Sequence, residues 1–353
     1  MTQERKREHI EIVSDEDVGA SYRYWDDIVL IHKALPEIDA DEIDMSVQIF
    51  GKKLSAPLII SAMTGGFEEA RRINENLAKA ASSLGVGMGV GSQRQALRDP
   101  SLEKSYSVVK DHNVPLVIGN IGAPQLIPQP NEEPLVLEDA EKAMAMIDAD
   151  VLAIHLNFLQ EIVQPEGDLK ARGCLEAVSE IARNLPVIGK ETGAGISRDV
   201  ALALKKADVV GIDVGGLGGT SFSAVEFYRA KRINDRRKQE IGKLYWDWGI
   251  PTPVSVIWAN VGLPIIATGG VQSGLDVARL IVLGASCGGM ASRLLPAAKE
   301  SHRAVEAELK AILNELRAAM FLTGSKSVED LAANEYVIRG PTAHWLKEME
   351  VVY

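Results

Sequence analysis

The sequence predicts a (β/α)₈ barrel. Short apolar runs alternate with helix-like stretches, eight such runs occur along the chain, and polar or small residues follow each run. The alternation is typical of a parallel sheet with helical crossovers. Eight strand–helix units within about 250 residues are the signature of a closed barrel. A doubly wound open sheet has the same alternation, and the strand count favours the barrel over it.

The eight apolar runs give the predicted strands, and an antiparallel segment is expected before them at residues 45–54. The strands are predicted at residues 58–60, 86–90, 115–119, 151–155, 186–189, 208–212, 264–267 and 287–290. After the first strand, Ile73, Leu77 and Ala81 recur at helical spacing, and Gly85 terminates the helix. After the seventh, Ser273 and Asp276 form a capping box that begins a helix running to Gly284.

One domain is expected over residues 1–353, with an N-terminal arm at 1–55, the barrel at 56–320 and a C-terminal segment at 321–353. A long insertion follows the sixth strand. Its stretch from Arg229 to Lys238, which also contains Arg232, Arg236 and Arg237, predicts an exposed helix or a subunit contact.

Composition excludes several classes of protein. The chain has 353 residues, 46% of them apolar, and 49 acidic against 38 basic residues give a net charge of -11. This charge argues against a general nucleic-acid or acidic-membrane binder. Cys174 and Cys287 lie far apart without metal-ligand spacing, and the start leads into no apolar signal core. We therefore expect a cytoplasmic, disulfide-free protein. No apolar run approaches the roughly 20 residues that cross a bilayer.

Residues that follow the strands should share one rim, because barrel enzymes work at the carboxyl ends of their strands. Asn120, His155 and Lys190 each lie at such an end. Turn chemistry explains the Gly and Ser residues of the rim but does not require these three. His155 and Asn157 point to the same face of an extended strand, and Gln160 and Glu161 follow them. The fourth strand therefore predicts contacts to a charged ligand.

Glycines that follow or close the last three strands predict a phosphate site. They occur at 215–216 and 218–219, at 269–270 and at 288–289. Glycine lets backbone N–H groups approach an anion, and the last loops of barrels commonly bind phosphate; a purely structural role is the alternative. The chain has no Walker sequence, and Gly85-Val86-Gly87 lacks the third glycine of a dinucleotide fingerprint. The pattern favours a phosphorylated mononucleotide.

Lys190 and Glu161 are the candidate charged ligands of the rim. A lysine at the mouth can stabilise an anionic, electron-rich ring; the alternative is a salt bridge to Glu191 or another acid. Glu161, beside Gln160 and near His155, could hold magnesium, which takes one or two protein carboxylates. A solvated loop charge is the alternative for Glu161. Zinc is disfavoured, because there is no His-x-x-x-His pair and no thiolate cluster.

The segment Arg5-Lys6-Arg7-Glu8-His9 is a basic arm in an acidic protein. Such an arm is usually solvated and disordered, or a nucleic-acid contact. The alternative is that it folds over a barrel mouth, its own or a neighbour's, and clamps a phosphorylated substrate through charge-assisted hydrogen bonds. The sequence leaves these interpretations open.

Taken together, these motifs resemble the type 2 isopentenyl-diphosphate isomerases, which use FMN. The resemblance covers nearly the whole chain. It is carried by Arg5-Lys6-x-Glu8-His9, Ala62-Met63-Thr64-Gly65-Gly66, Gly91-Ser92-Gln93-Arg94, His155-Leu156-Asn157 with Gln160-Glu161, Lys190-Glu191, Gly218-Gly219-Thr220, Asp247-Trp248-Gly249 and Gly269-Gly270.

The resemblance implies conversion between isopentenyl and dimethylallyl diphosphate in isoprenoid biosynthesis, with reduced FMN, Mg²⁺ and NADPH as flavin reductant. It also implies a homotetramer or homo-octamer with no nucleic-acid or membrane partner. Implied FMN contacts are Ala62, Met63, Thr64, Ser92, Asn120, Lys190, Thr220, Gly269, Gly270, Gln272, Ala291 and Ser292. Implied substrate contacts are Arg5, Lys6, His9, Arg94, His155, Asn157, Gln160 and Thr192. Gln160 is the implied catalytic side chain and Glu161 the magnesium ligand.

Two positions depart from the family pattern. Thr192 stands where some members have serine, which keeps a hydroxyl donor, and Phe222 stands where other members carry tryptophan.

The implied reaction explains the need for these groups. Moving a double bond by one carbon adds a proton to an unactivated alkene and removes another, through a transition state with cationic character. A reduced flavin is electron-rich and carries a proton on its central ring, so it can act as an acid–base catalyst. An FMN oxidoreductase on the same barrel is the enzymatic alternative, although it would use a base paired with arginines where this chain has Gln160 and Glu161. A non-catalytic flavin-binding regulatory barrel is the other alternative.

Overall fold

Eight parallel strands, β4 to β11, close into a barrel in which β11 pairs with β4. The computed structural model describes residues 2–130 and 132–349. The barrel strands are β4 (Leu58–Ile60), β5 (Gly87–Gly89), β6 (Val117–Gly122), β7 (Val151–Leu156), β8 (Val187–Glu191), β9 (Gly211–Asp213), β10 (Ile265–Ala267) and β11 (Cys287–Met290). The predicted barrel is thus confirmed, and the open sheet is not formed.

The ends of several strands differ from the prediction. β6, β8 and β10 begin after Pro115, Pro186 and Pro264, because proline has no N–H to donate to a neighbouring strand. The sixth strand was predicted from residue 208, but Asp208 has a left-handed φ of 63°, so β9 begins only at Gly211. β6, β7 and β8 also continue beyond the predicted ends. Asn120 and Lys190 therefore lie within strands rather than after them.

Apolar side chains fill the interior of the barrel. Ile59, Ile118, Ile188 and Ile266 are buried there together. The predicted antiparallel segment is present as the hairpin of β2 (Val47–Ile49) and β3 (Lys52–Leu54), whose buried side chains join the same cluster. The hairpin thus packs against the barrel interior and covers one end of the cylinder.

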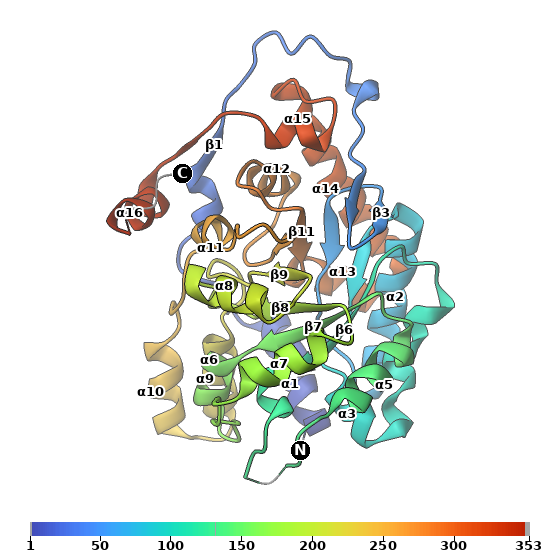
Figure 1. The fold of residues 1–353 in the computed structure, drawn as a ribbon, viewed down its shortest axis with the longest axis vertical. Helices are drawn as coiled ribbons and strands as arrows, with labels where there is room; N and C mark the ends of the chain where they lie inside the picture. Colours follow the sequence, from blue (N-terminus) through green and yellow to red (C-terminus); the bar gives the residue numbers. More distant parts are fainter. Residues whose placement is uncertain (1, 131, 350–353) are drawn as a thin grey trace.

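Helices surround the barrel (Figure 1). They are α1 (Thr2–Asp15), α2 (Glu68–Leu84), α3 (Arg94–Arg98), α4 (Lys104–Ser107), α5 (Leu137–Ile147), α6 (Phe158–Val163), α7 (Cys174–Ala182), α8 (Arg198–Lys206), α9 (Phe222–Arg232), α10 (Arg236–Leu244), α11 (Thr252–Trp258), α12 (Gly274–Val282), α13 (Leu295–Glu300), α14 (His302–Leu322), α15 (Val328–Ala332) and α16 (Gly340–Glu348).

Both helices predicted from caps are confirmed. α2 buries Ile73, Leu77 and Ala81 and ends at Gly85, whose φ is 66°. α12 has the capping box of Ser273 and Asp276 and ends at Val282, short of Gly284.

The insertion after β9 contains α9, α10 and α11. Arg232, Arg236 and Arg237 are exposed as predicted, but two helices separated by residues 233–235 replace one. Arg229 differs from these three, because its guanidinium pairs with Glu8, Glu166 and Glu226 and its side chain is only 12% exposed. Arg229 therefore belongs to the interior face of the insertion.

The two ends of the chain meet outside the barrel. β1 (Ile28–Leu30) pairs antiparallel with β12 (Tyr336–Ile338), and Figure 1 shows this blue strand beside the red C-terminal segment. The buried Asp27 carboxylate accepts hydrogen bonds from the N–H and hydroxyl of Thr342 at the start of α16. The sequence did not predict this pairing, which fixes the N-terminal arm around β1 to the C-terminal segment.

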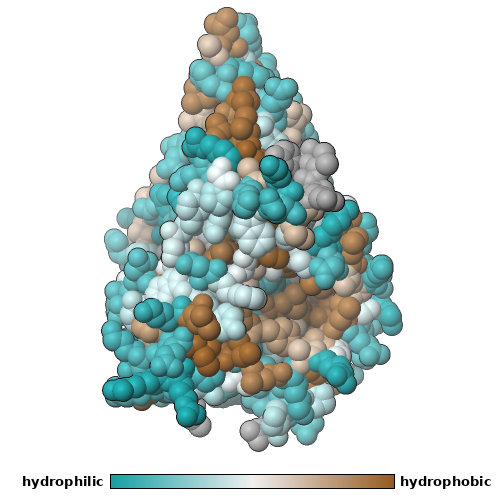
Figure 2. Space-filling model, turned by 90° about the vertical axis from the view of Figure 1, so that its left-hand side faces the viewer, coloured by the Kyte–Doolittle hydropathy of each residue, from teal (hydrophilic) through white to brown (hydrophobic). Residues whose placement is uncertain are grey.

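The visible surface in Figure 2 is mostly hydrophilic, with separate apolar areas. Over the described residues, no helix is both long and apolar enough to span a bilayer. Cys174 and Cys287 are buried and free, as the predicted absence of disulfides requires.

Candidate functional site

The open end of the barrel and helix α1 enclose a cavity of about 280 Å³. All the residues that the sequence singled out for the site line this cavity. They are Arg5, Lys6, His9, Ala62, Met63, Thr64, Ser92, Arg94, Asn120, His155, Asn157, Gln160, Glu161, Lys190, Thr192, Thr220, Gly269, Gly270, Gln272, Ala291 and Ser292. The basic arm thus forms α1 and folds over the mouth of its own barrel.

One side of the cavity is built from two glycine loops that pack backbone against backbone. A Cβ at Gly270, where φ is 74°, would lie 2.2 Å from the carbonyl oxygen of Gly218. A Cβ at Gly219 would lie 2.6 Å from the nitrogen of Gly270. Such loops can present backbone N–H groups to an anion at a distance that side chains would prevent. This side fits the phosphate group of a mononucleotide.

Lys190 lies in the cavity wall between the barrel interior and the mouth. Its Nζ is 2.6 Å from Oδ2 of the buried Asp213, whose other oxygen accepts a hydrogen bond from Thr268. The Glu191 carboxylate instead accepts hydrogen bonds from the N–H groups of residues 193–195. The alternative of a salt bridge is therefore confirmed for another acid, Asp213, and wrong for Glu191. Burial raises the pKa of Glu191 to about 7, against the effect of those N–H donors.

His155 is held as a neutral imidazole. The Asn120 amide donates to the Val90 carbonyl at 3.0 Å, which turns its oxygen toward His155 Nδ1 at 2.7 Å. Nδ1 therefore carries the hydrogen, and Nε2 is left as an acceptor. Burial, with the charges of Lys190, Arg94 and Lys6, lowers the pKa of His155 to about 3. His155 can orient a donor but brings no positive charge to an anionic ligand.

Glu161 is the centre of an oxygen-rich cluster. Its carboxylate accepts hydrogen bonds from the Asn157 amide at 2.9 Å, from the Gln164 amide and from the Asp168 N–H at 2.8 Å. Burial raises the pKa of Glu161. The buried amide oxygens of Asn157 and Gln164 have no hydrogen-bond partner. A hard cation that takes oxygen ligands fits these groups.

Over the described residues, no group of three or more His, Cys, Asp or Glu side chains is placed to share an ion. A cation at Glu161 would therefore complete its shell with amide oxygens, water or ligand oxygens.

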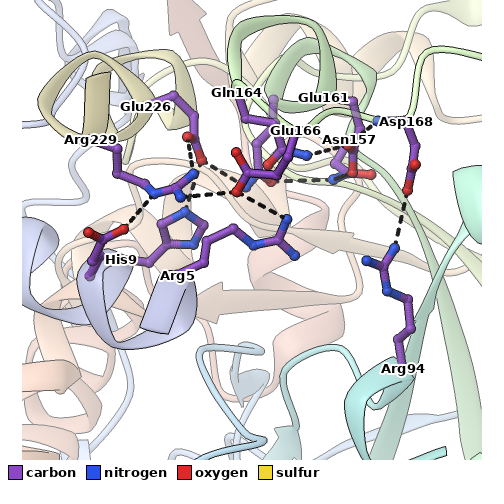
Figure 3. Close-up of polar contacts among 12 residues, drawn as sticks. Arg5, His9, Arg94, Asn157, Glu161, Gln164, Glu166, Asp168, Glu226 and Arg229 are labelled. Atoms are coloured by element: carbon purple, nitrogen blue, oxygen red, sulfur yellow. Dashed lines mark hydrogen bonds and ion pairs between the residues drawn. The ribbon is translucent and has the colours of Figure 1, made fainter. Parts of the chain in front are cut away.

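Three cations line the same cavity: Arg5, Lys6 and Arg94 (Figure 3 shows Arg5 and Arg94). The Lys6 ammonium donates to the Ser92 carbonyl at 2.8 Å and to the buried Tyr106 hydroxyl at 2.7 Å. Burial, with repulsion from Arg5 and Arg94, lowers the pKa of Lys6 to about 7. The Nε of Arg5 is buried without a hydrogen-bond partner. Cations held this close to one another favour a multiply charged anion between them.

The buried Glu226 connects the arm to Gln160. Its Oε1 lies 2.9 Å from His9 Nε2 and 3.4 Å from Gln160 Nε2, and its Oε2 lies 2.7 Å from Arg229. Burial tends to raise the pKa of Glu226, but His9 and Arg229 outweigh it and lower the pKa. Asn157 donates to Gln160 Oε1 at 3.3 Å, so the Gln160 amide is held from both ends. Figure 3 shows His9 and Arg229 converging on Glu226.

The sequence analysis missed Glu226, Asp168, Asp213 and Tyr106. A glutamate in a helix followed by Arg229 and Lys231 is typical of a solvated face. The only signal for Glu226 is its spacing from Phe222 at the start of α9. Phe222 lines the cavity, and a residue four positions later lies on the same side of the helix.

Known proteins resemble this chain in sequence and in fold. Residues 251–338 match the family model described as FMN-dependent dehydrogenase. The crystal structure of a mandelate oxidase is similar with a TM-score of 0.63 and 18% identity, covering 96% of this chain and 98% of that one. That likeness concerns the fold alone.

Curated relatives named isopentenyl-diphosphate delta-isomerase match almost the whole chain. The protein from Archaeoglobus fulgidus is 48% identical, with 98% of each chain covered. The protein from Thermoplasma volcanium is 47% identical over 98% of this chain and 100% of its own length. The protein from Picrophilus torridus is 44% identical over 98% of this chain and 99% of its own. The chain therefore belongs to the isopentenyl-diphosphate delta-isomerase family and is an isomerase.

Proposed function

We propose that this protein interconverts isopentenyl diphosphate and dimethylallyl diphosphate with reduced FMN and Mg²⁺. The observation that carries the proposal is one cavity in which glycine loops and Lys190 face a cluster of cations, Gln160 and Glu161. The names of the full-length relatives and the FMN-dependent family model support it.

The glycine side of the cavity and Lys190 would hold FMN. Gly269, Gly270 and Thr220 suit the phosphate, and Lys190 suits the electron-rich ring. The other proposed contacts are Ala62, Met63, Thr64, Ser92, Asn120, Gln272, Ala291 and Ser292. When bound, reduced FMN supplies an electron-rich ring that can exchange a proton with an alkene and stabilise positive charge.

The charged side would bind the diphosphate. Arg5, Lys6 and Arg94 supply positive charge, while His9, Asn157 and Thr192 supply hydrogen bonds. The neutral His155 would orient one of these groups or accept from the ligand through Nε2. Glu161, with the free amide oxygens beside it, would hold Mg²⁺ on the diphosphate and oppose its loss as a leaving group.

Gln160 would act beside the reacting carbons. An amide is too weak an acid to protonate an alkene, so its proposed role is to orient the substrate and relay the second proton. The hydrogen bonds to Asn157 and Glu226 fix the direction of its amide. Helix α1 covers part of the mouth with Arg5, Lys6 and His9 and would limit the access of water to this region.

The cellular part of the proposal depends on family membership. We propose NADPH as flavin reductant, a place in isoprenoid biosynthesis in the cytoplasm, and a homotetramer or homo-octamer. The division into arm (1–55), barrel (56–320) and C-terminal segment (321–353) of one domain belongs to the same proposal. Light scattering on the purified protein would test the subunit number.

The deciding experiment follows isopentenyl diphosphate by NMR with the anaerobically reduced FMN protein, with and without Mg²⁺. We expect isomerisation only with reduced FMN and Mg²⁺, without stoichiometric consumption of reductant. Equal rates with oxidised or flavin-free protein would contradict the proposal. Net oxidation of a substrate coupled to flavin reduction would instead support an FMN oxidoreductase.

A further inference from the structure

The segment between α1 and β1 runs along the first glycine loop. The N–H of Ala20 donates to the carbonyl of Gly219 at 2.9 Å, and the N–H of Ser221 donates to the carbonyl of Val18 at 2.8 Å. Gly19 faces Thr220 in an antiparallel bridge. We call residues 18–25 the linker. It forms a short antiparallel ladder with the loop that is proposed to bind the FMN phosphate.

The linker also holds the second glycine loop. The buried indole of Trp25 donates to the carbonyl of Gly269 at 2.9 Å, and the Thr252 hydroxyl donates to the same oxygen. Since the backbones of Gly219 and Gly270 are already in contact, one stretch of chain is bonded to both halves of this phosphate site.

Two residues of the insertion clamp the linker from outside. The Asp247 carboxylate accepts hydrogen bonds from the N–H of Ser21 at 2.9 Å and from its hydroxyl at 2.6 Å. The Trp246 indole donates to the carbonyl of Gly19 at 2.9 Å, and the Ser221 hydroxyl donates to the carbonyl of Trp246 at 2.6 Å. Hydrogen bonds therefore join the insertion, the linker and the glycine loop, each to the other two.

The linker in turn determines where α1 lies. Ile12 of α1 and Val18 of the linker are buried against Ala224 and Val225 of α9, with Trp246 packed against the same cluster. A shift of the linker would move this apolar contact, and with it the helix that carries Arg5, Lys6 and His9 over the cavity.

We propose that Asp247 is a positioning residue that couples occupancy of the glycine loops to docking of α1 over the cavity. The inference deepens the proposed function and rests on it, because it assigns FMN to the loops and the diphosphate to α1. An anion bound to the loops fixes the linker in one conformation. The docking of α1 then loses less conformational entropy, because part of the chain is already ordered. Coupling of this kind is reciprocal, so diphosphate binding under α1 must tighten FMN binding by the same factor.

The first test measures the dissociation constant of oxidised FMN, which keeps turnover out of the titration. It is determined with and without isopentenyl diphosphate and Mg²⁺. In the wild type we expect the diphosphate to tighten FMN binding about tenfold, within the range of typical coupling factors. Asp247→Ala should reduce this factor to below about threefold while leaving the affinity for FMN alone within about threefold.

Asp247→Asn keeps an oxygen for the Ser21 N–H and should restore most of the coupling. Glu240→Ala, on the exposed part of α10, is the matched control and should keep all of it. A merely structural role for Asp247 would weaken FMN binding equally with and without the diphosphate, and that result would overturn the inference.

The second test follows tryptic cleavage at Arg5, Lys6 and Arg7 by mass spectrometry. FMN alone should slow this cleavage in the wild type and in Glu240→Ala but not in Asp247→Ala. Equal protection in all three proteins would overturn the coupling while leaving the proposed function in place. A wild type that binds neither FMN nor the diphosphate would overturn the proposed function, and the inference with it.

Discussion

The two sides of the cavity are built in different ways. The glycine side consists of backbone at the ends of barrel strands, where Gly219 and Gly270 touch without intervening side chains. The charged side consists of long side chains from α1, α3, α6 and α9, held by contacts such as the hydrogen bond of His9 with Glu226 and the ion pair of Arg229 with Glu8. The first is built from backbone that follows the barrel strands and is bonded to the linker. The second depends on contacts between distant parts of the sequence.

This difference suggests a division of labour. A rigid backbone surface suits a cofactor that stays bound, whereas side chains carried by a covering helix suit a substrate that must enter and leave. If the division holds, substitutions on each side should change different measurable quantities.

The largest effect is expected at Gln160. Gln160→Leu keeps the approximate volume but removes the amide, so turnover should fall about 100-fold or more, the usual range for a lost proton-transfer group. FMN affinity should stay unchanged, because Gln160 belongs to the charged side. Gln48→Leu, the same change at an exposed position of β2, is the control. Unchanged turnover would remove Gln160 from the mechanism, and weakened FMN binding would break the division.

A smaller effect is expected at Glu161. Glu161→Gln removes the only carboxylate among the proposed magnesium ligands and turns two amide donors, from Asn157 and Gln164, toward a poorer acceptor. We expect the Mg²⁺ concentration for half-maximal turnover to rise about 10- to 100-fold. Chelation by EDTA should abolish turnover in the wild type. Glu176→Gln, on an exposed position of α7, should leave the Mg²⁺ titration unchanged.

How far the sequence predicts the molecule also differs between the two sides. The strands and their rim follow from apolar runs and the residues after them, so Lys190, Gly269 and Gly270 could be placed in advance. The charged side could be predicted only in part. Asn157, Gln160 and Glu161 are local to one strand end, whereas the pairing of His9 with Glu226 joins residues 217 positions apart.

Non-local pairing also explains the missed elements. β1 and β12 are three residues each and meet only in the folded chain, so neither carries a recognisable strand pattern. The basic arm was ambiguous for the same reason. Its sequence shows Lys6 and His9 but not their buried partners, Tyr106 and Glu226, which hold α1 on its own barrel.

The glycine side can be tested by adding one methyl group. Gly270→Ala forces a residue with φ 74° to carry a Cβ 2.2 Å from a backbone oxygen. The left-handed conformation alone costs about 1–2 kcal/mol, and the clash moves the loop, so FMN affinity should fall more than about tenfold. Gly262→Ala, also at positive φ but beside the flexible end of Lys205, is the matched control. Flavin fluorescence would measure both.

The smallest effect is expected from the charge on Lys6, and it can be seen only through pH. The pKa of about 7 means that Lys6 is protonated below pH 7 and loses its charge above it. A diphosphate prefers the ammonium, so substrate binding should weaken as pH rises from 7 to 9, by less than about tenfold in total. Lys6→Arg keeps its charge throughout this range and should flatten the profile. FMN affinity should show no such dependence on Lys6.

A pH profile of KM for the diphosphate that is identical in wild type and Lys6→Arg would show that another group titrates. In that case the positive charge of this side would come from Arg5 and Arg94, and Lys6 would only anchor α1 to Ser92 and Tyr106.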